Sequence, residues 1–182
     1  MKGREIVVGV TGGIAAFKTA ALVSKLVQSG AGVTVVLTAA AEQFVGAATF
    51  AALTGRAVAR AHFDSTRHPL GEHIELAEGK DLLLVAPASA SFLAKAAQGL
   101  ADDVLSTLYL AFTGPVLLAP AMNTAMWAKP AVQRNVTQLQ ADGIHFVDPT
   151  AGWLSCRQVG AGRMAEPEAI LEAVKKLLAE KA

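Results

Sequence analysis

A lone asparagine lies among apolar residues directly after residues 116–119, an apolar run typical of a buried parallel strand. The segment that holds it, residues 120–127, contains Asn123 among Ala, Met and Trp side chains. In an open α/β sheet, ligands bind in the crevice outside the carboxyl ends of the strands. An amide in an apolar wall both donates and accepts hydrogen bonds, which suits a carboxylate or peptide group of a small molecule. Equally compatible is a structural role, in which Asn123 caps a helix and the Met and Trp residues pack in the core.

A turn with two glycines follows the first predicted strand, residues 6–10, and precedes a predicted helix over residues 15–29. Glycines at such a turn let the backbone approach a phosphate, which the free amides and the dipole of the helix start attract. Gly12 and Gly13 are therefore candidate phosphate-binding residues. Tight packing of the strand against the helix would also require small residues, and the turn alone does not exclude that alternative.

The surroundings of this turn favour a mononucleotide over ATP or a dinucleotide. Phe17 stands where a P-loop needs a glycine before Lys18, and the glycines do not follow the pattern Gly-x-Gly-x-x-Gly. The second predicted strand, residues 33–37, leads to Thr38 and not to the acidic residue that binds a dinucleotide ribose. We therefore expect a mononucleotide phosphate here.

Two residues have side chains suited to proton transfer. Cys156, the single cysteine, lies in a glycine-rich stretch without periodicity, residues 150–163, which we expect to form a mobile flap. Arg157 and Arg163 beside it would favour the thiolate, which fits a cysteine acid on a lid. The alternative is that Cys156 is an exposed thiol with no function. His73 ends a polar loop shortly before a strand, and because a lone histidine is more often structural, its placement leaves both roles open.

Other polar residues point less clearly to chemistry. Residues 87–91, Pro-Ala-Ser-Ala-Ser, follow a buried strand and could line a ring or phosphate pocket, but an ordinary loop with Ser91 as a helix cap is the favoured interpretation. The four histidines, at positions 62, 68, 73 and 145, lack the spacing of a metal site and have no cysteine nearby. We expect no metal.

The composition indicates one domain over residues 1–182, long enough for a substantial core. A net charge of +1 does not suggest a nucleic acid or a membrane surface as partner. Hydrophobic residues make up 53%, yet no apolar run reaches membrane-spanning length. We expect the excess in parallel strands buried on both faces and in a subunit interface.

The start of the chain and its cysteine content predict a cytoplasmic location. Residues 1–5 lead straight into a strand without the apolar region of a signal peptide. One cysteine cannot form an intrachain disulfide, which fits a reducing compartment.

Predicted strands and helices alternate along the chain. Strands are expected at residues 6–10, 33–37, 82–86, 116–119 and 144–147, with a weaker candidate at 56–63. Helices are expected at residues 15–29, 42–53, 92–98, 102–112, 131–141 and 167–180, with a polar loop at 64–72. This alternation predicts an α/β fold of three layers, a Rossmann or flavodoxin-like doubly wound parallel sheet.

Five segments, in this order, resemble the flavin-dependent cysteine decarboxylases. They are residues 12–16, 73–76, 87–90, 120–127, and Cys156 with 160–167. The resemblance covers almost the whole chain and implies a single FMN-binding decarboxylase domain. The implied reaction is the FMN-dependent decarboxylation of 4′-phosphopantothenoylcysteine to 4′-phosphopantetheine in coenzyme A biosynthesis, through thioaldehyde and ene-thiolate intermediates.

The resemblance also implies roles for single residues. His73 would be the active-site base, and Cys156 the proton donor on a flap that closes over the substrate. Candidate substrate-binding residues are Asn123, Met122, Lys18 and Arg163, the last two from charge alone.

Contacts to FMN are implied for residues in the loops after several strands. They are Gly12, Gly13, Ile14, Thr38, Phe44, Ser89, Ala90, Ser91, Phe92 and Ala121. The family pattern often has Asn-Thr where this chain has Ser91-Phe92. Side-chain hydrogen bonds from these two positions to the flavin are therefore in doubt, whereas backbone contacts can survive.

The resemblance implies a homo-oligomer, a trimer or a dodecamer of four trimers, with FMN between subunits. A peptidyl-cysteine decarboxylase is the nearest alternative, but an enzyme that stops at the ene-thiol does not need the flap cysteine. A flavin prenyltransferase should lack both the segment around Asn123 and Cys156. A non-catalytic FMN-fold regulatory protein would typically lose one of these residues or carry acidic tails.

Overall fold

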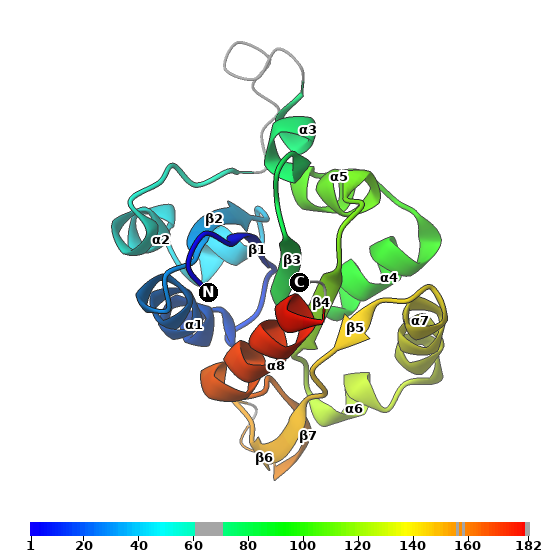
Figure 1. Cartoon of the computed structure of the whole chain (residues 1–182). Helices are drawn as coiled ribbons and strands as arrows, with labels where there is room; N and C mark the ends of the chain where they lie inside the picture. Colours follow the sequence, from blue (N-terminus) through cyan, green and yellow to red (C-terminus); the bar gives the residue numbers. More distant parts are fainter. Residues whose placement is uncertain (61–70, 156, 158, 181–182) are drawn as a thin grey trace.

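The computed structural model describes residues 1–60, 71–155, 157 and 159–180. At its centre lies a five-stranded sheet of order β2-β1-β3-β4-β5, in which every pairing is parallel (Figure 1). The strands are β1 (Glu5–Val10), β2 (Gly32–Leu37), β3 (Leu82–Ala88), β4 (Val116–Pro120) and β5 (His145–Phe146). This order is that of a flavodoxin-like sheet, so the predicted doubly wound parallel fold is confirmed.

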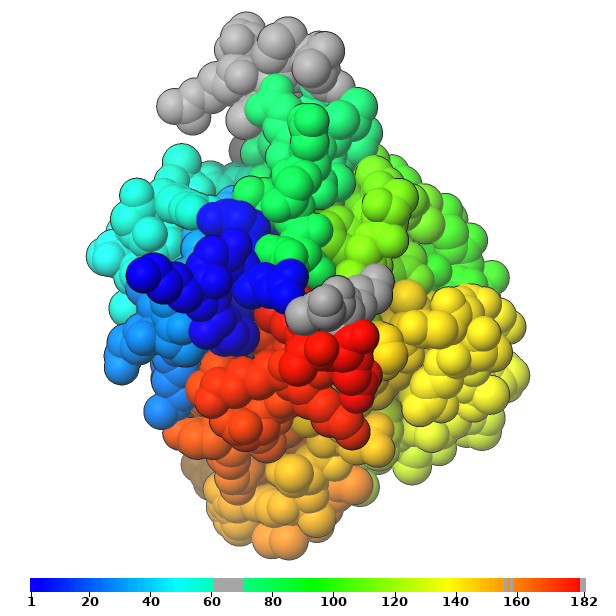
Figure 2. Space-filling view, in the orientation of Figure 1, coloured from blue at the N-terminus to red at the C-terminus, as the bar shows by residue number. Residues whose placement is uncertain are grey.

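Helices cover both faces of the sheet and give three layers. One layer contains α1 (Ala16–Gln28), α2 (Ala47–Thr54) and α8 (Pro167–Ala179). The other contains α3 (Glu72–Ala77), α4 (Ala90–Gln98), α5 (Val104–Ala111) and α7 (Pro130–Ala141). Figure 2 shows α8, in red, lying across the middle of one face of the molecule. None of the described helices combines the length and apolar character needed to span a bilayer.

The sequence of β1 explains why both faces need cover. Ile6 and Val8 point into the core beneath α1 and α8, whereas Val7 points into the core beneath α5 and α7. All three side chains are fully buried, as expected where successive residues of a strand face opposite layers. The high apolar content is thus partly explained by a sheet with two buried faces.

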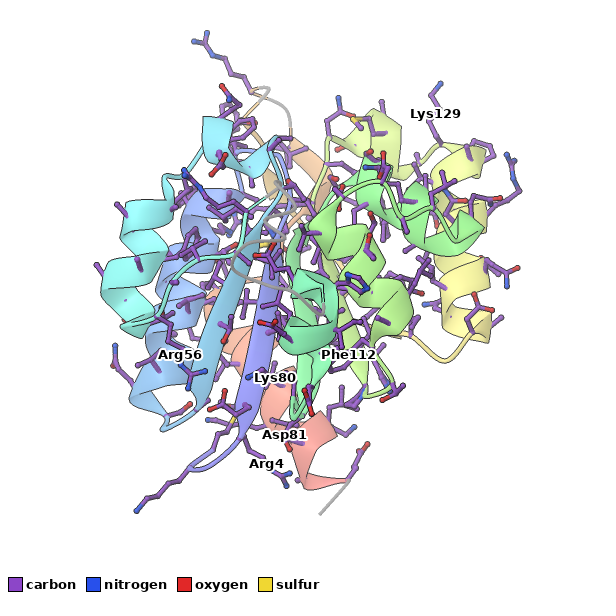
Figure 3. The ribbon with its side chains drawn as sticks, turned by 90° about the horizontal axis from the view of Figure 1, so that it is seen from above. Arg4, Arg56, Lys80, Asp81, Phe112 and Lys129 are labelled. Carbon is purple, nitrogen blue, oxygen red and sulfur yellow. The ribbon has the colours of Figure 1, made fainter. Side chains whose placement is uncertain are left out.

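Ion pairs connect the start of β1 to neighbouring segments at the amino-terminal edge of the sheet. Arg4 binds Asp81 at 2.9 Å, and Glu5 accepts hydrogen bonds from Arg56 at 2.6 Å and Lys80 at 3.3 Å. Figure 3 shows Arg4, Lys80 and Asp81 close together below the strands. The Arg56 hydrogen bond, aided by Lys80, lowers the pKa of Glu5 to about 2 although partial burial opposes this.

The predictions of one strand and one helix near β2 were wrong in part. Of the candidate strand at residues 56–63, only Ala59 pairs with the sheet, through single hydrogen bonds to Val35 and Leu37, and residues 61–63 lie outside the described residues. The helix predicted at 42–53 is a short 3₁₀ turn, η1 (Ala41–Gln43), followed by α2, because Gly46 between them adopts an extended conformation.

Two further predictions are corrected near the expected site. The stretch at 150–163 is not irregular but forms an antiparallel hairpin of β6 (Thr150–Trp153) and β7 (Val159–Arg163). Glycines in this stretch interrupt the alternation of apolar and polar side chains that usually indicates a strand. They lack a side chain because they pack closely against neighbouring residues. The cap of α4 is Ser89, not Ser91: the Ser89 hydroxyl accepts a hydrogen bond from the Phe92 amide at 3.3 Å.

Candidate active site

A cavity of about 580 Å³, here called the hairpin cavity, lies where three segments meet. These segments are residues 13–18 after β1, residues 121–123 after β4, and the β6–β7 hairpin with the residues that lead into α8. Two of the three thus follow the carboxyl ends of parallel strands, the edge at which open α/β sheets bind ligands.

Asn123 serves as a helix cap and also faces this cavity. It is the N-cap of the short helix α6 (Thr124–Trp127), where its Oδ1 accepts a hydrogen bond from the Met126 amide at 2.7 Å. The residue is exposed and lines the hairpin cavity. The cap uses only the oxygen, so the amide nitrogen is left to donate to a ligand, and the two predicted roles are compatible.

The hairpin is seated directly on the segment around Asn123. The Met122 amide donates a hydrogen bond to the Gly162 carbonyl at 2.9 Å. A Cβ on Gly162 would collide with the Met122 carbonyl oxygen, and a Cβ on Gly160 with the Thr124 hydroxyl. These two glycines therefore allow β7 to lie close enough to close one side of the cavity.

The end of β6 and the residues after it also line the cavity. Trp153, Leu154 and Ser155 all contribute to its wall. Cys156 lies outside the described residues, directly after Ser155.

The charged side chains of the cavity gather at one place. Lys18 and Arg163, both predicted from charge to bind the substrate, each donate to Glu166, Lys18 at 3.0 Å from the carboxylate oxygen Oε1. The hydrogen bond from Arg163, together with that from Lys18, lowers the pKa of Glu166 and keeps it ionised. Sequence inspection did not single out Glu166, because an acidic residue before Pro167 at a helix start has an ordinary explanation in the helix dipole.

A second cavity of about 380 Å³ lies at the switch point of the sheet, between the carboxyl ends of β1 and β3. Flavodoxin-like folds bind their mononucleotide at this place. Among its lining residues are many of the predicted FMN contacts: Gly12, Thr38, Ser89, Ala90, Ser91 and Phe92. Gly13, Ile14 and Ala121, also predicted contacts, line the hairpin cavity instead.

The two glycines of the first turn have different surroundings. A Cβ on Gly12 would lie 2.5 Å from the Ala40 Cβ, so Gly12 is required for packing against the turn after β2. A Cβ on Gly13 would meet nothing within 4 Å, although Gly13 lines the hairpin cavity. Backbone packing thus explains Gly12, whereas the open space at Gly13 fits a bound group.

The start of α4 offers mainly its backbone to the switch-point cavity. The Phe92 ring is buried and packs edge-on against Tyr109, with ring centroids 6.0 Å apart. Lys95, which also lines this cavity, is bound to Asp103 at 2.9 Å. A phosphate here would therefore be held by amides and hydroxyls and not by an unpaired cation, which fits the backbone contacts expected at positions 91 and 92.

Of the predicted site residues that the structure describes, two line neither cavity. Phe44 follows η1 and is exposed. His73 lies in α3, which packs against α5, and its buried Nδ1 has no hydrogen-bond partner among the described residues. Figure 1 shows α3 and the β6–β7 hairpin at opposite ends of the molecule. Within one chain, His73 is thus not brought together with Asn123.

Comparison with known proteins agrees with this architecture. A model of the family described as Flavoprotein matches residues 1–179. The chain belongs to this family. The resemblance drawn from the five sequence segments is thereby confirmed at the level of the family.

Several curated relatives are named coenzyme A biosynthesis bifunctional protein CoaBC. That of Bacillus subtilis (strain 168) is 45% identical over 180 residues, and that of Haemophilus influenzae (strain ATCC 51907 / DSM 11121 / KW20 / Rd) is 44% identical over 181 residues. These matches take in 99% and 100% of this chain but only 44% and 45% of the relatives. The chain therefore spans less than half the length of these proteins.

Several solved structures match this chain over nearly their full lengths. A PPC decarboxylase, a cysteine-to-serine variant complexed with pantothenoylaminoethenethiol, has a TM-score of 0.86 at 30% identity and covers 100% of both chains. The FMN-dependent cysteine decarboxylase SpaF has a TM-score of 0.83 at 34% identity, covering 98% of this chain and 97% of its own.

Proposed function

We propose that this chain is an FMN-dependent carboxy-lyase domain that converts 4′-phosphopantothenoylcysteine to 4′-phosphopantetheine in coenzyme A biosynthesis. The observation that carries the proposal is the hairpin cavity, in which Asn123, the hairpin that bears Cys156 and a basic cluster meet. The CoaBC relatives and the PPC decarboxylase structure support the same reaction. The sequence has a single cysteine, which suits a reducing environment, and this supports a cytoplasmic location.

The switch-point cavity and the adjoining wall of the hairpin cavity fit FMN. The residues that would hold it are Gly12, Gly13, Ile14, Thr38, Ser89, Ala90, Ser91, Phe92 and Ala121. When bound, FMN supplies a reversible two-electron acceptor, without which loss of the substrate carboxylate would leave an unstabilised carbanion. Phe44 remains a proposed contact on the strength of the resemblance.

The side chains of the hairpin cavity orient the substrate and exclude water. The Asn123 amide nitrogen would hold the substrate carboxylate or amide, with Met122 beside it, while Trp153 and Leu154 cover the reacting end. Cys156 would give a proton to the ene-thiolate carbon left after CO₂ departs. The complex of a cysteine-to-serine PPC decarboxylase with an aminoethenethiol supports this role, since a lost proton donor should leave that species unprotonated.

The base role of His73 requires a second copy of the chain. His73 lines neither cavity, so we propose that the FMN site is completed between subunits of a trimer, or of a dodecamer of four trimers, with His73 entering from the neighbour. Exposed apolar side chains support such contacts: Ile74 next to His73 is 46% exposed, and Phe17 in the hairpin cavity 60%.

Complementation would test this division of the site. His73→Asn and Asn123→Asp should each be inactive when pure, yet recover part of the activity when unfolded together and reassembled. Reassembled mixtures that stay inactive, although they bind FMN and have the size of the wild-type assembly, would contradict a site built from two copies.

The proposed reaction has a direct test. Purified protein should be yellow, release FMN on denaturation, and convert 4′-phosphopantothenoylcysteine to a product lighter by CO₂, as measured by mass spectrometry. A colourless protein that does not take up FMN, or a yellow one that leaves this substrate unchanged, would refute the proposal.

A peptidyl-cysteine decarboxylase is kept as a second candidate because SpaF, 34% identical, is named as a cysteine decarboxylase without reference to a phosphorylated group. The same assay with a peptide ending in cysteine separates the two. We expect turnover of the peptide to be negligible, because Lys18 and Arg163 offer cations that a neutral peptide cannot use. A stable FMN complex that turns over neither substrate would instead favour a regulatory FMN-binding protein.

A further inference from the structure

Glu166 lies at the start of α8 but does not cap it. Glu166 is the N-cap residue of the helix, yet its side chain forms no capping hydrogen bond. Instead the carboxylate turns to the hairpin cavity, where one oxygen, Oε1, accepts from both Lys18 and Arg163. Lys18 also donates to the Met164 carbonyl at 3.4 Å, and its side chain is only 15% exposed. The three groups therefore form an ordered cluster in the wall of the cavity.

The charges of this cluster do not cancel. Among the described lining residues of the hairpin cavity, these three are the ones that carry charge, with two cations against one anion. The Arg163 Nε is buried and has no hydrogen-bond partner among the described residues. The cluster thus keeps a surplus positive charge and a spare donor, while Glu166 occupies the position that an incoming anion would take.

We propose that Glu166 is a specificity-determining residue that acts as an internal counter-anion, held by Lys18 and Arg163 until the terminal phosphate of the substrate replaces it. This inference rests on the proposed function, because it assigns the phosphorylated end of that substrate to the cluster. Without substrate, Glu166 keeps the two cations together. A phosphate dianion offers more charge and more acceptor oxygens than one carboxylate, so it can displace Glu166 where a monoanion cannot.

Removing the charge of Glu166 should therefore strengthen phosphate binding. The experiment compares dissociation constants of 4′-phosphopantetheine and pantetheine for the FMN-loaded protein by isothermal titration calorimetry. In Glu166→Gln the preference for the phosphorylated ligand should rise about fivefold, the size expected from one partly exposed ion pair. In Lys18→Gln the preference should fall by a similar factor.

Glu168→Gln is the matched control. Glu168 also joins α8 to α1, through Lys25 at 3.0 Å, but it does not line the hairpin cavity. This variant loses a more exposed ion pair between the same helices and should keep the wild-type preference. A preference in Glu166→Gln that is unchanged, lowered, or matched by Glu168→Gln would overturn the inference.

A measurement on the wild-type protein does not depend on how any variant folds. The phosphate ester should bind at least about fivefold more tightly than the 4′-sulfate ester of pantetheine, which carries one negative charge, and the sulfate ester should bind no better than pantetheine. Equal binding of both esters would overturn the inference while leaving the decarboxylase proposal intact. Failure to bind any of these ligands, together with failure to release CO₂ from the substrate, would overturn both.

Discussion

Replacement of Gly162 by alanine tests whether the contact of the β6–β7 hairpin with Met122 is needed for activity. Gly162 has φ +123° and lies against Met122, whose amide donates to its carbonyl. An alanine at this position adds a methyl group that points at the Met122 carbonyl oxygen. The hairpin can avoid the collision only by moving away from the segment that holds Asn123.

The size of the effect follows from three contributions. The unfavourable backbone conformation at φ +123° costs alanine about 1–3 kcal/mol. Loss of the hydrogen bond between Met122 and Gly162 adds about 0.5–1.5 kcal/mol, and residual overlap brings the total to about 2–5 kcal/mol. Since a two-stranded hairpin is marginally stable by itself, we expect it to detach locally while the sheet stays folded.

Gly143→Ala provides the control, because Gly143 also has a positive φ, +84°, but a Cβ there meets nothing within 4 Å. It should lower Tm by about 4 °C and leave kcat/KM within about twofold of the wild type. Gly162→Ala should lower kcat/KM at least about tenfold and abolish the protection of residues 159–163 from hydrogen exchange. Native exchange and native activity in Gly162→Ala would refute the reasoning.

Three further predictions concern single side chains. Asn123→Asp keeps an oxygen that can cap α6 but loses the amide donor and adds a negative charge. Tm should therefore stay within about 2 °C of the wild type, while kcat/KM falls at least about 100-fold. Parallel losses of Tm and activity would mean that Asn123 serves only as a helix cap. Cys156→Ser should still release CO₂ but accumulate the ene-thiol, as read by mass spectrometry, and formation of normal 4′-phosphopantetheine would remove Cys156 from the mechanism. The Arg56 hydrogen bond lowers the pKa of Glu5 from 4.5 to about 2, so this contribution to stability is complete above pH 4.5 and is lost as the pH falls towards 2. Because Glu5 is about one-third exposed, Glu5→Gln should cost about 1–2 kcal/mol at pH 7, and its Tm deficit should close between pH 4.5 and 2; a deficit that is constant over this range would contradict the assignment.

The strands and long helices could be predicted because their pattern is local. The apolar runs at residues 6–10 and 82–86 are buried in β1 and β3, and the apolar spacing at residues 167–180 becomes α8. The misassigned elements depend on contacts distant in the chain. Strand β7 carries Gly160 and Gly162 where a strand usually has alternating side chains, and the reason lies in residues 122–124, more than thirty positions earlier.

The site shows the same division. Asn123 and Gly13 could be proposed from their types and from the loops that hold them, because carboxyl ends of parallel strands meet at one edge. Arg163 could be proposed only from its charge. The amino-acid sequence by itself thus determined the fold class, the edge of the sheet at which both cavities lie and the kinds of groups present there. Only the tertiary structure decided which groups meet: it separates His73 from the hairpin cavity and joins Glu166 to Lys18, because side-chain pairing depends on how α1, α3 and α8 pack, and no local pattern encodes that packing.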